Sequence, residues 1–176
     1  MVRSDEALME NLRQGDIQAF GELYTRHRQS LFNFLYRLLH DAALAEDVFQ
    51  ETYIRVLENA DRFNPRRKYS TWLYTIAHNL CMDELRRQNM SIPAEKMATS
   101  PPARDPLERL LEREDEETVH QLLAGLNPNL RAVVVLRVLR GCSQEETANI
   151  VGIPVGTVKS RLHNALRQLR LMARDQ

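Results

Sequence analysis

Apolar residues recur three or four positions apart along most of the chain, which is the spacing of one face of an α-helix. The 176 residues include only 6 glycines and 7 prolines, so long stretches contain no helix breaker. The pattern therefore predicts an all-α protein. The expected helices span residues 5–14, 16–39, 42–59, 70–88, 107–124, 128–140, 143–151 and 155–173, and the second of them allows a kink or a split.

One segment interrupts this pattern. Residues 89–106 read NMSIPAEKMATSPPARDP, hold four of the 7 prolines and show no sustained apolar period. Such a composition is typical of a flexible linker. We therefore expect two small helical domains, residues 1–88 and 107–176, joined by the linker 89–106.

Residues that begin and end helices stand at several of the expected boundaries. Asp41 and Ser70 precede the third and fourth helices, where a short polar side chain accepts a hydrogen bond from a free backbone N–H. Ser143 followed by Glu146 is a capping-box pattern. Glycine at helix ends and proline in first helical turns are expected at Gly125, Gly141, Gly152, Pro128 and Pro154.

Charge is unevenly distributed, although the 24 basic and 24 acidic side chains balance. The net charge is −1 over residues 1–90, −4 over 91–124 and +5 over 125–176. A basic C-terminal segment suits contact with phosphate, but a solvated helix face has the same composition.

The composition argues against a membrane or secreted protein. No apolar run is long enough to span a bilayer, and residues 1–15 contain no apolar signal core. Cys81 and Cys142 are far apart in sequence and are expected to stay reduced. These observations predict a cytoplasmic protein.

Residues 143–162, SQEETANIVGIPVGTVKSRL, predict a helix-turn-helix with its turn at 151–153. One stripe of the second helix is apolar and consists of Val158, Leu162, Ala165, Leu166 and Leu169. The opposite face consists of Gly156, Thr157, Ser160, Asn164 and Arg167, with Lys159 and Arg161 on the flanks. Small residues and hydrogen-bond donors on an outer face favour DNA recognition, whereas the alternative is an ordinary amphipathic helix.

Residues 45–58, AEDVFQETYIRVLE, predict a helix with one polar face that contains a single apolar residue. The expected core side comprises Ala45, Val48, Phe49, Thr52, Tyr53, Val56 and Leu57. The opposite side comprises Asp47, Gln50, Glu51, Ile54 and Glu58. Ile54 among polar partners at helical spacing is suited to docking a partner helix, although single exposed apolar residues are common.

Residues 61–87 combine a basic, aromatic loop with the helix that follows it. The expected core stripe comprises Tyr69, Leu73, Ile76, Ala77 and Leu80. Residues expected to face away are Thr71, Tyr74, Thr75, His78, Met82 and Arg86, with Trp72 and Asn79 at the edge. Aromatic rings beside arginines and amides suit unstacked bases, whereas the alternative places Trp72 in the core.

Three segments, AEDVFQETYIRVLE, STWLYTIAHNLCMDELRR and SQEETANIVGIPVGTVKSRLHNALRQLR, closely resemble the extracytoplasmic-function (ECF) sigma factors of bacterial RNA polymerase. The resemblance implies an alternative sigma factor with no catalysis of its own, no cofactor and no metal. It would bind core RNA polymerase and direct promoter-specific initiation through −35 and −10 recognition and promoter melting. Residues 1–88 would be sigma region 2 and residues 107–176 sigma region 4.

The resemblance also assigns partners and residues. The partners would be the clamp coiled coil and flap of core RNA polymerase, promoter DNA, and an anti-sigma factor that could hold the protein at the membrane. Membrane insertion and a small-molecule substrate are not expected. Polymerase contacts would be Asp47, Gln50, Glu51, Ile54 and Glu58. Contacts to the −10 element would be Asn64, Arg66, Arg67, Lys68, Tyr69, Thr71, Trp72, Thr75, His78 and Asn79. Contacts to the −35 element would be Arg131, Gly156, Thr157, Lys159, Ser160, Arg161, Asn164 and Arg167.

One departure and two alternatives remain. The loop NPRRKY differs from the shorter, more acidic loop of the family, which leaves the −10 preference open. A stand-alone helix-turn-helix regulator would explain the C-terminal domain but not the face around Ile54. An enzyme or metal-linked sensor would rest on the spacing of His78 and Cys81 alone, without a phosphate loop or nucleophile motif.

Overall fold

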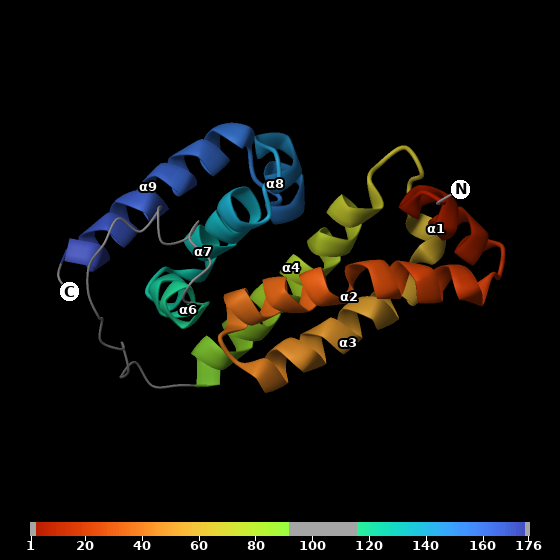
Figure 1. The fold of residues 1–176 in the computed structure, drawn as a ribbon, viewed down its shortest axis with the longest axis horizontal. Coiled ribbons are helices and arrows are strands. Elements are labelled where there is room, and N and C mark those ends of the chain that lie inside the picture. The colour runs from red at the N-terminus through yellow and green to blue at the C-terminus, as the bar shows by residue number, and fades with distance from the viewer. Residues whose placement is uncertain (1–2, 92–115, 175–176) are drawn as a thin grey trace. The chain divides into compact units, whose positions relative to one another are not determined.

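The computed structural model describes residues 3–91 and 116–174, and the regular elements within these ranges are all helical (Figure 1). The chain forms two compact units, residues 1–81 and 82–176. The all-α prediction is confirmed. Residues 92–106 of the predicted linker, and residues 107–115 of the expected helix that follows it, lie outside the described residues.

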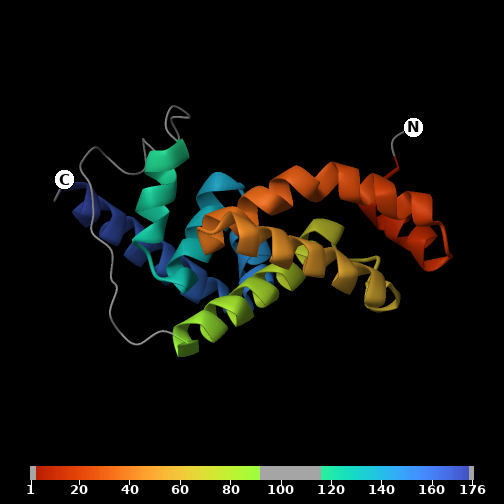
Figure 2. The same cartoon turned by 90° about the horizontal axis from the view of Figure 1, so that it is seen from below.

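The first unit is built around two long helices that lie side by side (Figures 1 and 2). They are α2 (Ile17–Leu39) and α3 (Ala42–Glu58), preceded by α1 (Asp5–Arg13) and followed by the 3-10 turn η1 (Ala60–Arg62) and α4 (Tyr69–Ser91). Helix α4 continues ten residues past the boundary at residue 81. Helix α2 is continuous, without the split that the sequence allowed.

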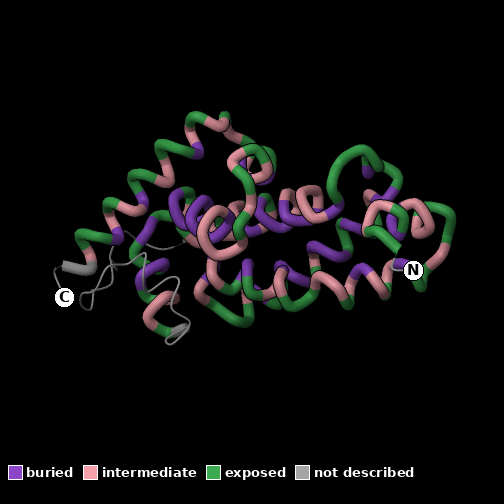
Figure 3. Tube along the Cα trace, turned by 45° about the horizontal axis from the view of Figure 1, so that its top comes forward, coloured by how far each residue is buried: buried purple, intermediate pink, exposed green. Residues whose placement is uncertain are grey.

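Aromatic rings connect α2 to α3. The Tyr53 ring lies 4.9 Å from that of Tyr24, 5.1 Å from that of Phe49 and 5.9 Å from that of Phe20, between ring centroids. Edge-to-face and tilted pairs of this kind add stability beyond the area that they bury. The buried positions therefore gather along the facing sides of these helices (Figure 3).

The second unit contains α6 (Glu116–Ala124), α7 (Pro128–Val134), the π-helical turn η2 (Val135–Leu139), α8 (Gln144–Val151) and α9 (Val155–Arg174). Val133, Ala148 and Val158 form its buried centre, one residue from each of α7, α8 and α9. Partly buried Ile153, Val155 and Leu162 pack against this centre. The region predicted as one helix over 128–140 thus changes to π geometry, in which the Arg140 N–H donates to the Val135 carbonyl at 3.0 Å.

Two of the three predicted N-cap residues, Asp41, Ser70 and Ser143, are confirmed. The Leu44 N–H donates to Asp41 Oδ1 at 3.0 Å, and Ser143 and Glu146 form both bonds of the capping box. Ser70 is wrong as an N-cap because α4 already begins at Tyr69, and its first turn closes on the Lys68 carbonyl.

Candidate functional site

A helix-turn-helix lies in the second unit, where a tight turn joins α8 to α9. Gly152 adopts a φ of 73°, a left-handed conformation that glycine accepts without steric strain. The N–H groups of Gly152 and Ile153 donate to the Ala148 carbonyl at 2.9 and 3.1 Å, which closes the end of α8. The predicted motif is confirmed, and the burial of Val158 turns the opposite face of α9 outward.

The outer face of α9 is polar and basic. Its exposed residues from the predicted set are Gly156, Lys159, Ser160, Asn164 and Arg167, and its partly buried ones are Thr157 and Arg161. No aspartate or glutamate occurs between Val155 and Arg174, so this helix carries uncompensated positive charge. Ser160 Oγ donates to the Thr157 carbonyl at 3.1 Å, which leaves its oxygen lone pairs as acceptors.

Arg131 does not belong to this outer face, which corrects its predicted contact with DNA. Its side chain is buried, and its guanidinium donates to the carbonyl oxygens of Leu123 at 2.8 Å, Ala124 at 3.2 Å and Leu126 at 2.8 Å. The carbonyls of Leu123 and Ala124 belong to the last turn of α6, where helical partners run out, and that of Leu126 lies two residues beyond its end. The Leu123 carbonyl also accepts from the Leu126 N–H at 3.1 Å. Arg131 therefore holds α6 against α7.

The loop between η1 and α4 folds into a turn that presents basic side chains. The Arg67 N–H donates to the Asn64 carbonyl at 2.9 Å, and the Arg66 N–H donates to Asn64 Oδ1 at 3.0 Å. Asn64 thus uses its backbone and its side chain to shape the loop. Arg66, Arg67 and Lys68 are exposed, so three adjacent cations face solvent.

An aromatic cluster supports this loop. Phe63 and Tyr69 are buried at its two ends, and their ring centroids lie 5.3 and 6.2 Å from that of Trp72. Trp72 is partly buried. It is thus neither fully in the core nor fully open to an unstacked base, the two alternatives that the sequence left open. Burial, more than the neighbouring Tyr53 or Asp5, raises the pKa of the Tyr69 phenol well above its usual range. The cluster is therefore a neutral apolar support for a cationic loop.

Three residues of α4 lie in the core and not on its surface. Tyr74 and His78 were predicted to face away from the core, and both are buried. Tyr69 is fully buried, so neither it nor His78 presents a side chain for the predicted DNA contact. The predicted stripe also included Ile76 and Leu80, and both are only partly buried. The buried face of α4 is therefore rotated from the predicted stripe toward Tyr74, His78 and Cys81.

The exposed edge of α4 keeps the remaining predicted residues. Asn79 is exposed, whereas Thr71 and Thr75 are partly buried. Thr75 Oγ1 donates to the Thr71 carbonyl at 2.7 Å, so that hydroxyl proton is already engaged by the helix. Asn79, with two donors and an acceptor on its amide, has the greatest capacity for base-edge hydrogen bonds among these residues.

The outer face of α3 combines acidic groups with apolar ones. Asp47, Gln50, Ile54 and Glu58 are exposed, and Glu51 is partly buried, as the sequence predicted. Arg55 Nε donates to Glu51 Oε1 at 2.7 Å, which raises the pKa of the arginine and neutralises part of the acidic charge.

Sequence reasoning missed Leu57, which it placed in the core. Leu57 is 42% exposed and Ile54 is 48% exposed, so two apolar side chains one helical turn apart face solvent. A signal existed in the sequence, because Leu57 lies three positions after Ile54 and therefore near its face.

A second residue without any predicted role is Glu6, on α1. Its Oε1 accepts a hydrogen bond at 3.0 Å from the Tyr69 N–H, at the first residue of α4. No local pattern could have indicated this contact, because the two residues are 63 positions apart.

The described ranges contain no group of three or more histidine, cysteine, aspartate or glutamate side chains arranged to hold a metal ion. Cys81 is buried and Cys142 is partly buried, and neither forms a disulfide. Within the same ranges, no helix is both long enough and apolar enough to cross a membrane.

Comparison with known families matches both units. The family model described as Sigma-70 region 2 matches residues 23–90, and the model described as Sigma-70, region 4 matches residues 116–169. The first match contains α3, the basic loop and α4, and the second contains the helix-turn-helix.

Relatives match over nearly the whole chain. The ECF RNA polymerase sigma factor SigW of Bacillus subtilis is 34% identical over 178 residues, which cover 95% of each chain. The RNA polymerase sigma-H factor of Pseudomonas aeruginosa is 33% identical over 172 residues, which cover 92% of this chain and 89% of the relative.

Solved structures share the fold. CnrH, in complex with the cytosolic domain of CnrY, superposes with a TM-score of 0.72 at 24% identity and covers 97% of both chains. The sigma factor RpoE of Bartonella quintana, in complex with the anti-sigma factor NepR, superposes with a TM-score of 0.71 at 24% identity and covers 87% of this chain and 95% of its own.

Proposed function

Because this chain belongs to the family of ECF RNA polymerase sigma factors, we propose that its exposed surfaces divide the steps of promoter-specific initiation among them. The protein binds core RNA polymerase and directs it to promoters. The polymerase supplies the bond-forming chemistry, so this chain contributes binding and no active site. The proposed site of action is the cytoplasm, where RNA polymerase binds promoter DNA.

The acidic and apolar face of α3 is the surface for polymerase. Ile54 and Leu57 supply apolar anchors, and the exposed carboxylates of Asp47 and Glu58 orient the partner through charge. A helix face of this size fits one partner helix laid along it. The clamp coiled coil of core polymerase is therefore its proposed occupant.

The basic loop and the exposed edge of α4 are the surface for the −10 element. Arg66, Arg67 and Lys68 attract the phosphates, while Trp72 and Asn79 offer a ring and an amide to an unstacked base. Flipping a base costs a few kcal/mol, which contacts of this kind must offset. Tyr69 and His78 support the surface from beneath and are not assigned a base contact.

The outer face of α9 is the surface for the −35 element. Ser160, Asn164 and Arg167 face outward from the centre of the helix and are suited to base edges in the major groove. Lys159 and Arg161 on the flanks are suited to phosphates. The observation that carries the whole assignment is that the two family matches, at residues 23–90 and 116–169, contain all three surfaces.

An anti-sigma factor is a further proposed partner. The structural neighbour RpoE was solved with the anti-sigma factor NepR bound, and CnrH with the cytosolic domain of CnrY. A protein that covers the exposed faces of α3 and α9 would block polymerase and DNA together. The test is whether a co-purified protein, added back in stoichiometric amount, stops transcription by the reconstituted enzyme, and failure to inhibit would reject the role.

Run-off transcription with purified core polymerase on a promoter library tests the function directly. We expect defined start points that depend on the added chain and share one −35 and one −10 motif. Transcription without a defined start point would contradict the assignment, as would a footprint on a palindromic site in the absence of polymerase.

A further inference from the structure

We infer that Glu6, on α1, is a positioning residue for promoter opening, because its carboxylate fixes the first turn of the helix that carries the −10 surface. The inference rests on the function proposed above for the loop and α4. It assigns a role to a helix outside both family matches, which span residues 23–90 and 116–169.

The residue immediately before helix α4 offers no side-chain acceptor to the N–H groups of the first turn. The preceding residue is Lys68, whose ammonium group donates hydrogen bonds and accepts none. The first N–H groups of a helix need an acceptor, which a serine, threonine, aspartate or asparagine at the N-cap usually supplies. Here the Tyr69 N–H donates to Glu6 Oε1 at 3.0 Å. A carboxylate at this end of the helix also stabilises the positive pole of its dipole.

The position of Glu6 is fixed by the packing of α1 on α2. Leu8 and Met9 are fully buried, and the neighbouring Asp5 bonds to α2 through both carboxylate oxygens. Asp5 Oδ1 accepts from Arg26 at 2.8 Å, and Asp5 Oδ2 lies 2.6 Å from His27 Nε2. Glu6 is therefore held in place before it accepts the bond from α4.

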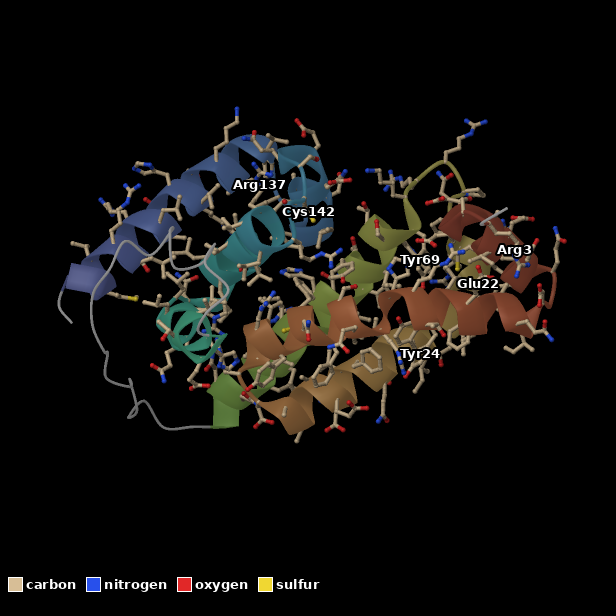
Figure 4. All side chains as sticks on the ribbon, viewed as in Figure 1. Arg3, Glu22, Tyr24, Tyr69, Arg137 and Cys142 are labelled. Carbon is tan, nitrogen blue, oxygen red and sulfur yellow. The ribbon has the colours of Figure 1, made fainter. Side chains whose placement is uncertain are left out.

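The first turn of α4 in turn sets the aromatic cluster under the loop. Figure 4 shows Tyr69 where α4 begins. Its ring centroid lies 5.2 Å from that of His27 on α2 and 6.2 Å from those of both Phe63 and Trp72. If the bond to Glu6 is lost, Ser70 becomes the nearest residue able to cap α4, and the helix then begins two residues later, at Thr71. The basic loop then gains length, and Trp72 loses its fixed support.

The chain reports on this turn without any label, because Trp72 is its single tryptophan. We expect Glu6→Ala to shift the Trp72 emission to longer wavelength in the free protein and to slow promoter opening roughly fivefold, the effect of losing about one helix cap. Opening is followed by permanganate reactivity of the −10 thymines with reconstituted polymerase. Glu6→Gln should restore both signals in large part, because an amide oxygen also accepts a hydrogen bond.

Glu10→Ala is the matched control on the same helix. Glu10 pairs with Arg13 at 2.9 Å and makes no bond to α4 among the described residues, so both signals should stay at the wild-type level. On a promoter that is already melted at the −10 element, all variants should transcribe equally, and their affinity for core polymerase should be equal.

Each other outcome decides against the inference. Wild-type opening and emission in Glu6→Ala would overturn the positioning role while leaving the sigma function intact. Equal impairment on the melted template would show a general folding defect instead. A failure of Glu6→Gln to recover either signal would reject the acceptor of the Tyr69 N–H as the cause. If the wild-type chain opens no promoter, the proposed function fails first and independently of Glu6.

Discussion

At the scale of single residues, the exposed pair on α3 offers a direct test of the polymerase surface. Ile54→Glu replaces an apolar anchor with a charge that must be desolvated on docking. We expect affinity for core polymerase to fall by about 2 kcal/mol, the value of burying one large aliphatic side chain. Thermal unfolding should change little, because Ile54 is 48% exposed in the free chain. Titration of labelled core polymerase measures the effect.

Ile17→Glu is the control for this substitution. Ile17 is 66% exposed at the start of α2, so the same change of side chain is made outside the docking face. Its affinity for core polymerase should equal that of the wild type. Full binding by Ile54→Glu, or an equal loss in Ile17→Glu, would remove the face on α3 from the proposal.

Arg131 leads to the opposite expectation, a loss of stability without a loss of DNA contacts. Arg131→Ala removes the guanidinium donor from the Leu126 carbonyl and one of two donors from the Leu123 carbonyl, which should cost about 3 kcal/mol. Arg170→Ala, an exposed change on α9, should cost less than about 0.5 kcal/mol. Denaturant unfolding of the full chain compares the two. Equal stability of both variants would return Arg131 to the list of possible DNA contacts.

Residue positions were predicted well on α9 and, apart from Leu57, on α3, but less well on α4. On α3 and α9 a single apolar stripe faces the core, and the outward residues Ile54 and Asn164 were placed correctly. On α4 the buried residues include Tyr74 and His78 beside the predicted stripe. Ile76 and Leu80 of that stripe are only partly buried, so the phase of the buried face was predicted wrongly. Tyrosine and histidine have both apolar and polar parts, so residue type alone does not place them on one face of a helix.

At the scale of elements, the helices were predictable because apolar spacing and local caps agree with each other. Asp41 and the Ser143–Glu146 box act within one turn of sequence, so a window of a few residues contains the whole signal. The start of α4 was not predictable, because its acceptor is on α1. The π-helical turn of η2 was also missed, since no residue type in VLRVL distinguishes it from a regular helix.

Two serine-to-alanine substitutions distinguish Ser143, which is an N-cap in the structure, from Ser70, which was predicted as one and is not. Ser143→Ala removes the acceptor of the Glu146 N–H and should destabilise the start of α8 by about 1 kcal/mol. Ser70→Ala, inside the first turn of α4, should leave the start of that helix unchanged, because Glu6 holds it. Hydrogen exchange at the first amides of each helix gives both answers. Faster exchange in α4 of Ser70→Ala would contradict the observed cap.

At the scale of the whole molecule, the net charge of zero is the sum of an acidic surface in one unit and a basic surface in the other. The acidic face of α3 suits a protein partner, whereas α9 carries basic residues and no acidic ones. A chain with balanced charge has little general attraction for DNA, so binding depends on the placement of a few cations and on the polymerase that holds both units.

We therefore predict that, in the assembled polymerase, substitutions on α9 can weaken phosphate binding without changing sequence recognition, and the reverse. Lys159→Ala should lower the magnitude of the slope of log affinity against log salt by about 0.9, the value for one lost phosphate contact, without changing the preferred −35 sequence. Asn164→Ala removes a neutral amide, so the slope should stay constant while discrimination at one base pair falls by about 1–3 kcal/mol. Promoter affinities over a salt series, on matched and single-mismatch −35 elements, measure both quantities. If Lys159→Ala relaxed the sequence preference, or Asn164→Ala changed only the salt slope, the assignment of flank to phosphate and centre to bases would be reversed.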